Sequence, residues 1–573
     1  MCGFIGKFLS KKKKIIEPKN FYKRGPDSYG HYSDEKLSVI FRRLAIVDKS
    51  DNANQPYNDN EQYVLVFNGE IYNYLELRDE LISKGIKFKS DSDTEVLYHL
   101  LINQGIDSLN KVNGIFAFAF YNKQSEHLIL GRDFIGVKPM YINFDDGVTF
   151  GSTYNSVKIN NRVHNLNDLH LKSFLKWQSV IFNRDNEYDI QELKPGYYYD
   201  SKTNKFTKWT KPKYPKISSK YYCEDLYNLI RECVNSQTPK DQKYAVLLSG
   251  GIDSSIIAHH LKDDSNAIYF SLGLVGSEDN ETGISEKTAK NMHLNFHKIE
   301  ITEKQLLQEI KDYLEFSDLP TADGLNTFII SKHINSHGIK VALSGVGGDE
   351  VFGGYAAFDT IYHNNLIDSI LDLLPDFIQR IKIFYKIRTQ FNRNLYFDNK
   401  ASFFKSYEIP MNNESGSSQS HYIDIRNLYN KYFLQPTILR DVDYFSMINS
   451  VEMRVPFLSS KLIDWTTQFS KNNPKMMINK NILRINYKKH LPSYVLERRK
   501  TGFNIGLKKI FVYPNKYLSK KIDDLQYFSF KNSHLNLLKN NTIKSYLKNS
   551  NTYNFRRIWL FIVLSNWIKK NER

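Results

Sequence analysis

The spacing of apolar residues over the first 200 positions is typical of strands. Residues 63–74 (YVLVFNGEIYNY) and 114–122 (GIFAFAFYN) are rich in β-branched and aromatic residues and predict two of these strands. The first strand is expected to run into a turn at Asn68-Gly69. Between them, apolar residues at helical spacing predict a helix over 73–85, with Gly85 as its C-terminal cap. We therefore expect a first domain over residues 1–200 that consists mainly of strands.

The pattern changes after a polar stretch over 201–220, which contains two prolines and predicts a linker. Beyond it, strand-like runs such as 243–251 and 267–274 alternate with helix-like runs. This alternation predicts a parallel α/β sheet. From about residue 360 onward the pattern is mostly helical, so we assign 221–573 to a second domain with extra helices.

Composition limits the class of protein. A chain of 573 residues exceeds the size of a single core, and its 41% hydrophobic content suits a globular protein. Three cysteines are too few for a disulfide framework and favour a reducing, cytoplasmic setting. The apolar stretch 558–568 is about half the ~20 residues that cross a membrane. We therefore expect it to be a buried helix, and we expect no membrane span.

The net charge of +17 raises the question of an anionic partner. Residues 516–573 hold 12 Lys and Arg against 3 Asp and Glu, which suits contact with nucleic acid or an anionic membrane surface. Glycine-aromatic repeats and arginine clusters of RNA-binding type are absent from the sequence. A solvated basic surface is the favoured interpretation, and no nucleic-acid partner is expected.

A glycine-rich stretch, LLSGGIDSS (247–255), lies between a predicted strand and a predicted helix. Gly250 and Gly251 let the backbone turn tightly and point N–H groups at an anion, next to the positive end of the helix. Asp253 does not suit an anion site unless Mg²⁺ lies between its carboxylate and a phosphate. No Gly-Lys-Ser/Thr follows, so this is not a Walker loop; an ordinary strand–helix turn is the alternative.

The stretch VALSGVGGDEVFGGY (341–355) repeats the arrangement of a strand and a glycine-rich turn. Asp349 and Glu350 follow the glycines and are placed to supply another carboxylate to a metal ion. Two glycine loops at strand ends indicate one nucleotide crevice at the carboxyl edge of the sheet.

Cys2 directly follows the first methionine. Removal of Met1 would leave a thiol and a free α-amino group on one carbon. An α-amino group has a pKa of about 7.7–8, so it can accept the thiol proton near neutral pH. Considered alone, a buried structural cysteine is the alternative.

Further motifs follow Cys2 in a fixed order. They are RGPDSYG (24–30), RRLAIVD (42–48), NGEIYNY (68–74), SDTEV (92–96), GRDFIGVKPMY (131–141), EMRVPFL (452–458) and KTGF (500–503). Together with Cys2 and the two glycine loops, the first of which is similar to the SGGxDS loop of ATP pyrophosphatases, they resemble the class B family of glutamine-dependent asparagine synthetases. The resemblance covers nearly all of the chain and is weakest at 360–430 and after 510.

The resemblance implies an α+β N-terminal-nucleophile (class II glutaminase) domain of αββα type. It also implies a second, α/β parallel-sheet domain of the ATP-pyrophosphatase (adenine nucleotide α hydrolase-like) type. Glutamine would supply ammonia through a dry channel. The ammonia would convert aspartate to asparagine through an aspartyl-adenylate, with ATP cleaved to AMP and diphosphate and with Mg²⁺ as cofactor. A homodimer is expected by the same analogy.

The family's functional positions map onto residues of this chain. Cys2 is the implied nucleophile, and Asn68 with the Gly69 N–H forms the implied oxyanion hole. The implied glutamine-binding residues are Arg43, Asn68, Gly69, Glu70 and Asp93.

In the second domain, Lys500 is the implied catalytic lysine near the adenylate, and Asp253 and Asp349 are the implied metal ligands. The segment MRVPFL (453–458) is expected to line or brace the domain interface, and Arg454 could be structural or catalytic. The implied ATP-binding residues are Leu248, Ser249, Gly250, Gly251, Asp253, Ser254, Ser255, Leu272, Ser344 and Gly345.

Four features depart from the family pattern, and one is that the segment between Cys2 and Arg24 is shorter than usual. Val346 stands where aspartate-specific members carry an acidic residue, Lys23 replaces a histidine, and FGST (150–153) lacks the usual Ser-Glu. The departures keep open a second interpretation, in which the same chemistry amidates another carboxylate, such as a sugar uronic acid in surface-polysaccharide biosynthesis. Two remoter alternatives are a tRNA-modifying ATP pyrophosphatase and a non-catalytic binding protein.

Overall fold

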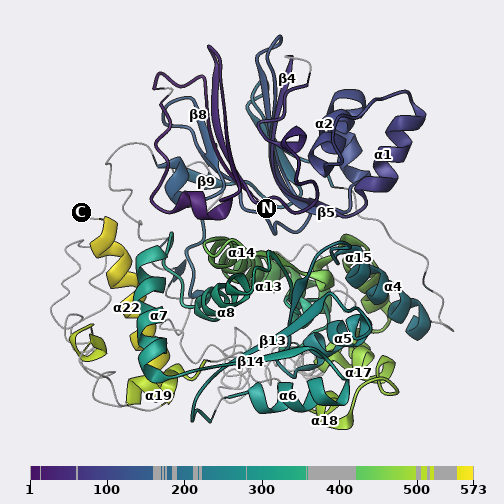
Figure 1. Cartoon of the computed structure of the whole chain (residues 1–573), viewed down its shortest axis with the longest axis vertical. Helices are drawn as coiled ribbons and strands as arrows, with labels where there is room; N and C mark the ends of the chain where they lie inside the picture. Colours follow the sequence, from purple (N-terminus) through teal and green to yellow (C-terminus); the bar gives the residue numbers. More distant parts are fainter. Residues whose placement is uncertain are drawn as a thin grey trace, which may run out of the picture.

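Figure 1 shows the two parts of the chain in a computed structural model, with the N-terminal sheets above the C-terminal α/β part. The structure describes residues 2–12, 14–59, 62–158, 190–210, 222–278, 280–355, 421–498, 505–512, 517–521 and 552–571, with isolated positions between 170 and 182, Ile217 and Phe358.

Two antiparallel sheets form the first domain. The first sheet has the spatial order β2 (Ser28–Ser33), β3 (Leu37–Arg43), β1 (Cys2–Phe8), β8 (Val148–Gly151), β7 (Tyr141–Asn143) and β9 (Ile190–Glu192). The second has the order β11 (Lys205–Lys208), β10 (Tyr197–Asp200), β6 (His127–Arg132), β5 (Gly114–Asn122) and β4 (Tyr63–Ile71).

The sheets stack on each other through alternating apolar residues. Phe4 and Phe41 of the first sheet share one core with Val66 and Ala117 of the second. Helices α1 (Tyr74–Ser83) and α2 (Asp93–Gln104) cover the outer face of the second sheet (Figure 1). The first turn of α2 therefore brings Asp93 close to the end of β4, where its carboxylate accepts a hydrogen bond from the Ile71 N–H.

The predicted linker begins too early. Residues 205–208 form β11, which pairs with β10, and Trp209 packs against Phe116 in the helix-covered core. The first domain therefore includes part of the stretch over 201–220 that the sequence assigns to a linker.

A five-stranded parallel sheet lies at the centre of the second domain. Its order is β14 (Phe296–Ile301), β13 (Ala267–Leu274), β12 (Tyr244–Leu247), β15 (Val341–Leu343) and β16 (Glu452–Arg454). The chain builds outward from β12 to one side and then returns to the other, so the order reverses between β12 and β15. In open parallel sheets, ligands bind at the carboxyl ends of the strands that flank this reversal.

Helices surround the sheet. They are α4 (Tyr222–Ser236), α5 (Ile252–Leu261), α6 (Thr282–Asn291), α7 (Glu303–Phe316), α8 (Leu325–Ser336), α9 (Gly348–Val351), α13 (His421–Tyr429), α14 (Arg440–Met447), α15 (Ser460–Asn472), α16 (Pro474–Met477), α17 (Asn481–Asn486), α18 (Ser493–Leu496), α19 (Leu507–Val512) and α22 (Thr552–Asn571). The predicted helical character of the C-terminal part holds for its described residues, and much of 360–430 lies outside them.

The apolar stretch 558–568 lies within α22 and is buried over most of its length, as predicted. Its tryptophans are anchored as well, because Trp559 donates to the Ala322 carbonyl and Trp567 to the Asp318 carbonyl. Within the described residues, no helix is long and apolar enough to cross a membrane.

A buried ion cluster joins the two domains. Asp443 of α14 lies 2.8 Å from Arg24 Nη2 and 3.0 Å from Lys138 Nζ, and all three side chains are at most 2% exposed. Both cations belong to the first domain. Burial disfavours the charged form of Asp443, yet the field of Arg24 and Lys138 holds its pKa below the usual value.

We predict that Asp443→Asn destabilises the protein by about 3–5 kcal/mol, because two buried cations lose their counter-charge. Urea unfolding followed by tryptophan fluorescence measures the change. Asp79→Asn, at an exposed position of α1, is the control and should shift stability by no more than about 0.5 kcal/mol. Equal unfolding midpoints for the two variants would show that the cluster does not stabilise the interface.

Candidate active sites

The first site surrounds Cys2, at the start of β1. Cys2 pairs with Arg43 of β3 and is 6% exposed. Its main-chain nitrogen donates to Asn68 Oδ1 at 3.1 Å, and this nitrogen becomes the α-amino group if Met1 is removed. Burial raises the pKa of the Cys2 thiol, so the neutral form predominates and a neighbouring base is needed to activate it.

Asn68 and Gly69 lie where β4 approaches Cys2. The Asn68 side chain is fully buried, and its Nδ2 has no hydrogen-bond partner among the described residues. An unpartnered buried N–H group is a donor ready for a ligand oxygen. Gly69 packs so closely on β5 that an added Cβ would lie 2.1 Å from the Ile115 carbonyl oxygen. These features fit the predicted oxyanion hole.

The structure brings the other predicted glutamine-binding residues to the same end of the sheets. Arg43 donates to the carbonyl oxygens of Asp48 and Ser50 and to Asn54 Oδ1 at 3.0 Å, so the adjacent loop holds its guanidinium. Asp93 is 5% exposed, and burial raises its pKa to about 6. A carboxyl group with this pKa is mostly charged near neutral pH and gains its proton as the pH falls toward 6.

Glu70 contacts the second domain. Its Oε2 lies 3.2 Å from Arg454 Nη2, and Arg454 Nε also pairs with Glu452 Oε1 at 2.5 Å. Burial raises the pKa of Glu70 to about 8, although Arg454 opposes this shift. The sequence indicated Glu70 as a glutamine ligand and Arg454 as an interface residue, but not that the two form an ion pair.

The second site begins with the first glycine loop, between β12 and α5. Gly250 has φ of 69°, a conformation that favours glycine. Ser254 Oγ donates to the Gly251 carbonyl and accepts from the Ser249 N–H, both at 3.1 Å. Ser255 Oγ is buried with no hydrogen-bond partner among the described residues. The loop is therefore a preformed turn at the N-terminus of α5, as an anion site requires.

The second glycine loop, between β15 and α9, contacts the first. A Cβ added to Gly345 would lie 3.2 Å from the Ser254 nitrogen, and one added to Gly348 would lie 2.6 Å from the Asp253 carboxylate. Both loops follow the strands that flank the reversal in strand order. The two loops therefore lie against each other, where the sequence predicts one nucleotide crevice. Leu248 and Leu272 are both buried.

Lys480, which the sequence reasoning missed, lies between the two candidate metal ligands. Its Nζ forms an ion pair with Asp253 and lies 2.6 Å from Asp349 Oδ1, and the residue is 5% exposed. Two carboxylates from different loops thus contact the same cation, the Lys480 ammonium. Mg²⁺ in nucleotide sites is commonly held by one or two carboxylates together with phosphate oxygens. The donor set therefore fits Mg²⁺.

Groups of three or more potential metal-binding side chains are absent from the described part of the chain. Any protein-bound Mg²⁺ at Asp253 and Asp349 would need phosphate or water oxygens to complete its coordination. The predicted catalytic Lys500 lies outside the described residues.

Apolar side chains of both domains pack together between the two sites. Leu44, Ile46 and Ile115 of the first domain share one cluster with Leu248 and Leu458 of the second. Leu458 reaches the second glycine loop, where a Cβ added to Gly347 would come within 2.4 Å of it. The apolar cluster therefore extends from the first domain to the second glycine loop.

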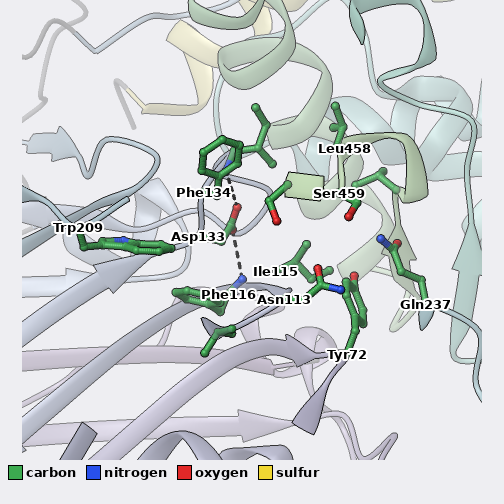
Figure 2. A pocket seen from close by; sticks show the side chains of 15 residues that line it. Tyr72, Asn113, Ile115, Phe116, Asp133, Phe134, Trp209, Gln237, Leu458 and Ser459 are labelled. Carbon is green, nitrogen blue, oxygen red and sulfur yellow. Dashed lines mark hydrogen bonds between the residues drawn. The ribbon is translucent and has the colours of Figure 1, made fainter. Parts of the chain in front are cut away.

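A small cavity also lies at the interface (Figure 2). Its volume of ≈ 20 Å³ suits about one water-sized molecule, which is too little for glutamine or a nucleotide. Tyr72 Oη and Gln237 Oε1, from opposite domains, have no hydrogen-bond partner within the described residues. The cavity is therefore separate from the two candidate substrate sites.

These features define a class of protein: a two-sheet domain with Cys2 beside Asn68, joined to a parallel α/β domain whose two glycine loops lie at the reversal in strand order. Comparison with known families agrees. Residues 1–214 match the glutamine amidotransferase domain, and residues 225–569 match asparagine synthase. The chain belongs to the asparagine synthase family, and the fold expected for both domains is confirmed.

The names of individual relatives state both asparagine synthesis and glutamine hydrolysis. The chain is 28% identical to asparagine synthetase [glutamine-hydrolyzing] 1 of Bacillus subtilis (strain 168), over 89% of this chain and 87% of that enzyme. It is 31% identical to asparagine synthetase B [glutamine-hydrolyzing] of Escherichia coli (strain K12), over 62% of this chain and 65% of that enzyme.

Proposed function

We propose that this protein is a glutamine-hydrolysing asparagine synthetase. It would convert ATP, L-aspartate, L-glutamine and water to AMP, diphosphate, L-asparagine and L-glutamate. One observation carries the proposal: a single chain holds the Cys2–Asn68 site and the crevice between two glycine loops. The family match over both domains and the names of the relatives support it.

In the glutaminase step, the Cys2 sulfur attacks the side-chain amide carbon of glutamine. A glutamyl thioester forms, ammonia leaves, and water then hydrolyses the thioester to glutamate. The thiol proton passes to the α-amino nitrogen of Cys2, which Asn68 Oδ1 orients, and from there to the leaving amide nitrogen, which departs as ammonia. Asn68 Nδ2 and the Gly69 N–H stabilise the oxyanion; one such donor contributes about 10²–10³-fold in rate.

In the synthetase step, an oxygen of the aspartate side-chain carboxylate attacks the α-phosphorus of ATP, and diphosphate leaves. Ammonia then attacks the activated carbonyl carbon, and AMP leaves. Ser249 and Ser254 bind the diphosphate, while Lys480 offsets its negative charge. Asp253 and Asp349 would hold Mg²⁺, which would neutralise further charge on the phosphates. The apolar contact between the domains supports transfer of ammonia without protonation.

The test is release of diphosphate with Mg-ATP and glutamine, across a panel of carboxylates headed by aspartate. We expect aspartate-dependent diphosphate release with an equal amount of asparagine. Glutamate formation without aspartate-dependent diphosphate would contradict the proposal and leave a working glutaminase with another acceptor.

Val346 favours a second candidate acceptor. It is half-buried in the second glycine loop and packs against two apolar clusters, so an apolar side chain stands in this loop where aspartate-specific members carry an acidic one. In this candidate function, the same chemistry amidates another carboxylate, such as a sugar uronic acid. Uronic acids therefore belong in the panel. A homodimer and a cytoplasmic location remain predictions.

Glutamine affinity is predicted to fall as the pH decreases from 8 to 5.5. Protonation of Glu70 (pKa about 8) and then of Asp93 (pKa about 6) removes the charges that attract the α-ammonium group. Calorimetry with Cys2→Ala measures the dissociation constant without turnover. In Asp93→Asn, the change near pH 6 should be lost. A dissociation constant that is flat over this range would exclude both carboxylates as ligands.

A further inference from the structure

Arg454 contacts the glutamine site from the second domain, and the mechanism above gives it no task. Its guanidinium pairs with Glu70 across the domain interface and with Glu452 on its own strand. Its Nη1 also donates to the Gln237 carbonyl at 2.8 Å. The side chain is 3% exposed, so these protein contacts hold the guanidinium in place and water has little access to it.

The main chain of Arg454 holds the second glycine loop. Leu343, the last residue of β15, is in register with Arg454 of β16. The Ser344 N–H then donates to the Arg454 carbonyl at 2.9 Å. Ser344 is also hydrogen-bonded within the loop, because its Oγ accepts from the Val346 N–H at 3.3 Å. One residue thus contacts Glu70 through its side chain and the start of the glycine loop through its backbone.

The charges around Arg454 make its position sensitive to a ligand cation. Glu70, Asp93 and Glu452 are 7%, 5% and 0% exposed, so three carboxyl groups share a poorly solvated region with this guanidinium. An α-ammonium group bound to Glu70 would neutralise part of the carboxylate charge that Arg454 now neutralises. Arg454 would then be held mainly by Glu452 and Gln237, on its own domain.

We propose that Arg454 is a positioning residue that couples occupancy of the glutamine site to the conformation of the second glycine loop. Binding of an α-ammonium group to Glu70 releases Arg454 toward Glu452, and β16 passes the shift to Ser344. The coupling is reciprocal, so the nucleotide in turn changes glutamine affinity by the same factor. This inference rests on the proposed function, which assigns glutamine and ATP to the two sites.

Equilibrium binding to Cys2→Ala tests the coupling, because both ligands can bind without glutamine turnover. Calorimetry gives the dissociation constant of Mg-ATP with and without saturating glutamine. We expect the two constants to differ by about fivefold or more. Adding Arg454→Met should reduce the ratio below about twofold. Arg454→Lys should give an intermediate ratio, because a single ammonium keeps the charge but loses the planar fork that contacts both glutamates.

Arg426→Met is the matched control. Arg426 is 4% exposed in the same domain, and its guanidinium donates to Thr466 and Thr467 of α15. It should leave the ratio unchanged. An unchanged ratio in Arg454→Met, or the absence of coupling in Cys2→Ala itself, would overturn the inference. If Arg454→Met does not fold, Arg454→Lys is decisive. A ratio of Mg-ATP dissociation constants equal to that of Cys2→Ala alone would then overturn the inference. Failure of Cys2→Ala to bind ATP or glutamine would instead count against the proposed function.

Discussion

Replacing Cys2 with alanine is expected to abolish glutamine-dependent asparagine formation, while formation from added ammonium salt continues. The variant removes the only nucleophile of the proposed glutaminase step, and loss of a catalytic nucleophile costs about 10³-fold or more in rate. The crevice between the glycine loops remains intact, because Cys2 contacts Asn68 within the first domain. Glutamate and asparagine release, measured in parallel with each nitrogen source, give the two rates.

Cys233→Ser is the matched control for Cys2. Cys233 is also buried, but it lies on α4 of the second domain, away from β4 and its oxyanion donors. It should retain glutamine-dependent synthesis within a few-fold. Equal loss of the glutamine-dependent and ammonia-dependent rates in Cys2→Ala would mean that Cys2 is structural, which is the alternative that the sequence leaves open.

The sequence predicted an element correctly where its apolar spacing and the residues at its ends indicate the same structure. The strand expected within 63–74 is β4, Tyr63–Ile71, and the helix expected over 73–85 is α1, Tyr74–Ser83. The turn expected at Asn68-Gly69 is wrong, because both residues pair with β5 and continue the strand. Gly85 has φ of 86° after that helix, which explains why a glycine stands there. Strand β11 was missed because all four of its residues are exposed, so no apolar alternation distinguishes it from a linker.

The candidate sites were predictable where one short segment contains the chemistry. Gly250, Gly251 and Asp253 belong to a single turn, so their spacing alone suggests an anion and a metal ion. Lys480 lies 227 positions from Asp253, and nothing in its local sequence separates it from the many other basic residues. The Glu70–Arg454 pair likewise exists only because the domains pack together.

Replacing Asp349 with asparagine is expected to reduce diphosphate release by about 10²–10³-fold, while glutamine hydrolysis persists. The change removes one of the two carboxylates that converge at Lys480 and are proposed to hold Mg²⁺. A metal ion bound to phosphoryl oxygens contributes several kcal/mol to catalysis, and each 1.36 kcal/mol corresponds to a factor of about ten. A higher Mg²⁺ concentration should be needed for half-maximal diphosphate release.

The control for Asp349 is Asp264→Asn, in the turn before β13, at the amino end of the same parallel sheet. The Asp264 carboxylate accepts from the Tyr244 hydroxyl at 2.7 Å, so its loss disturbs the fold of the domain without touching the crevice. If both variants lost diphosphate release equally, destabilisation would explain the result. Unchanged release and Mg²⁺ dependence in a folded Asp349→Asn would exclude Asp349 as a ligand. In that variant, Lys480 would pair with Asp253 alone. Its ammonium would then be the main positive charge that the two loops offer to the phosphates.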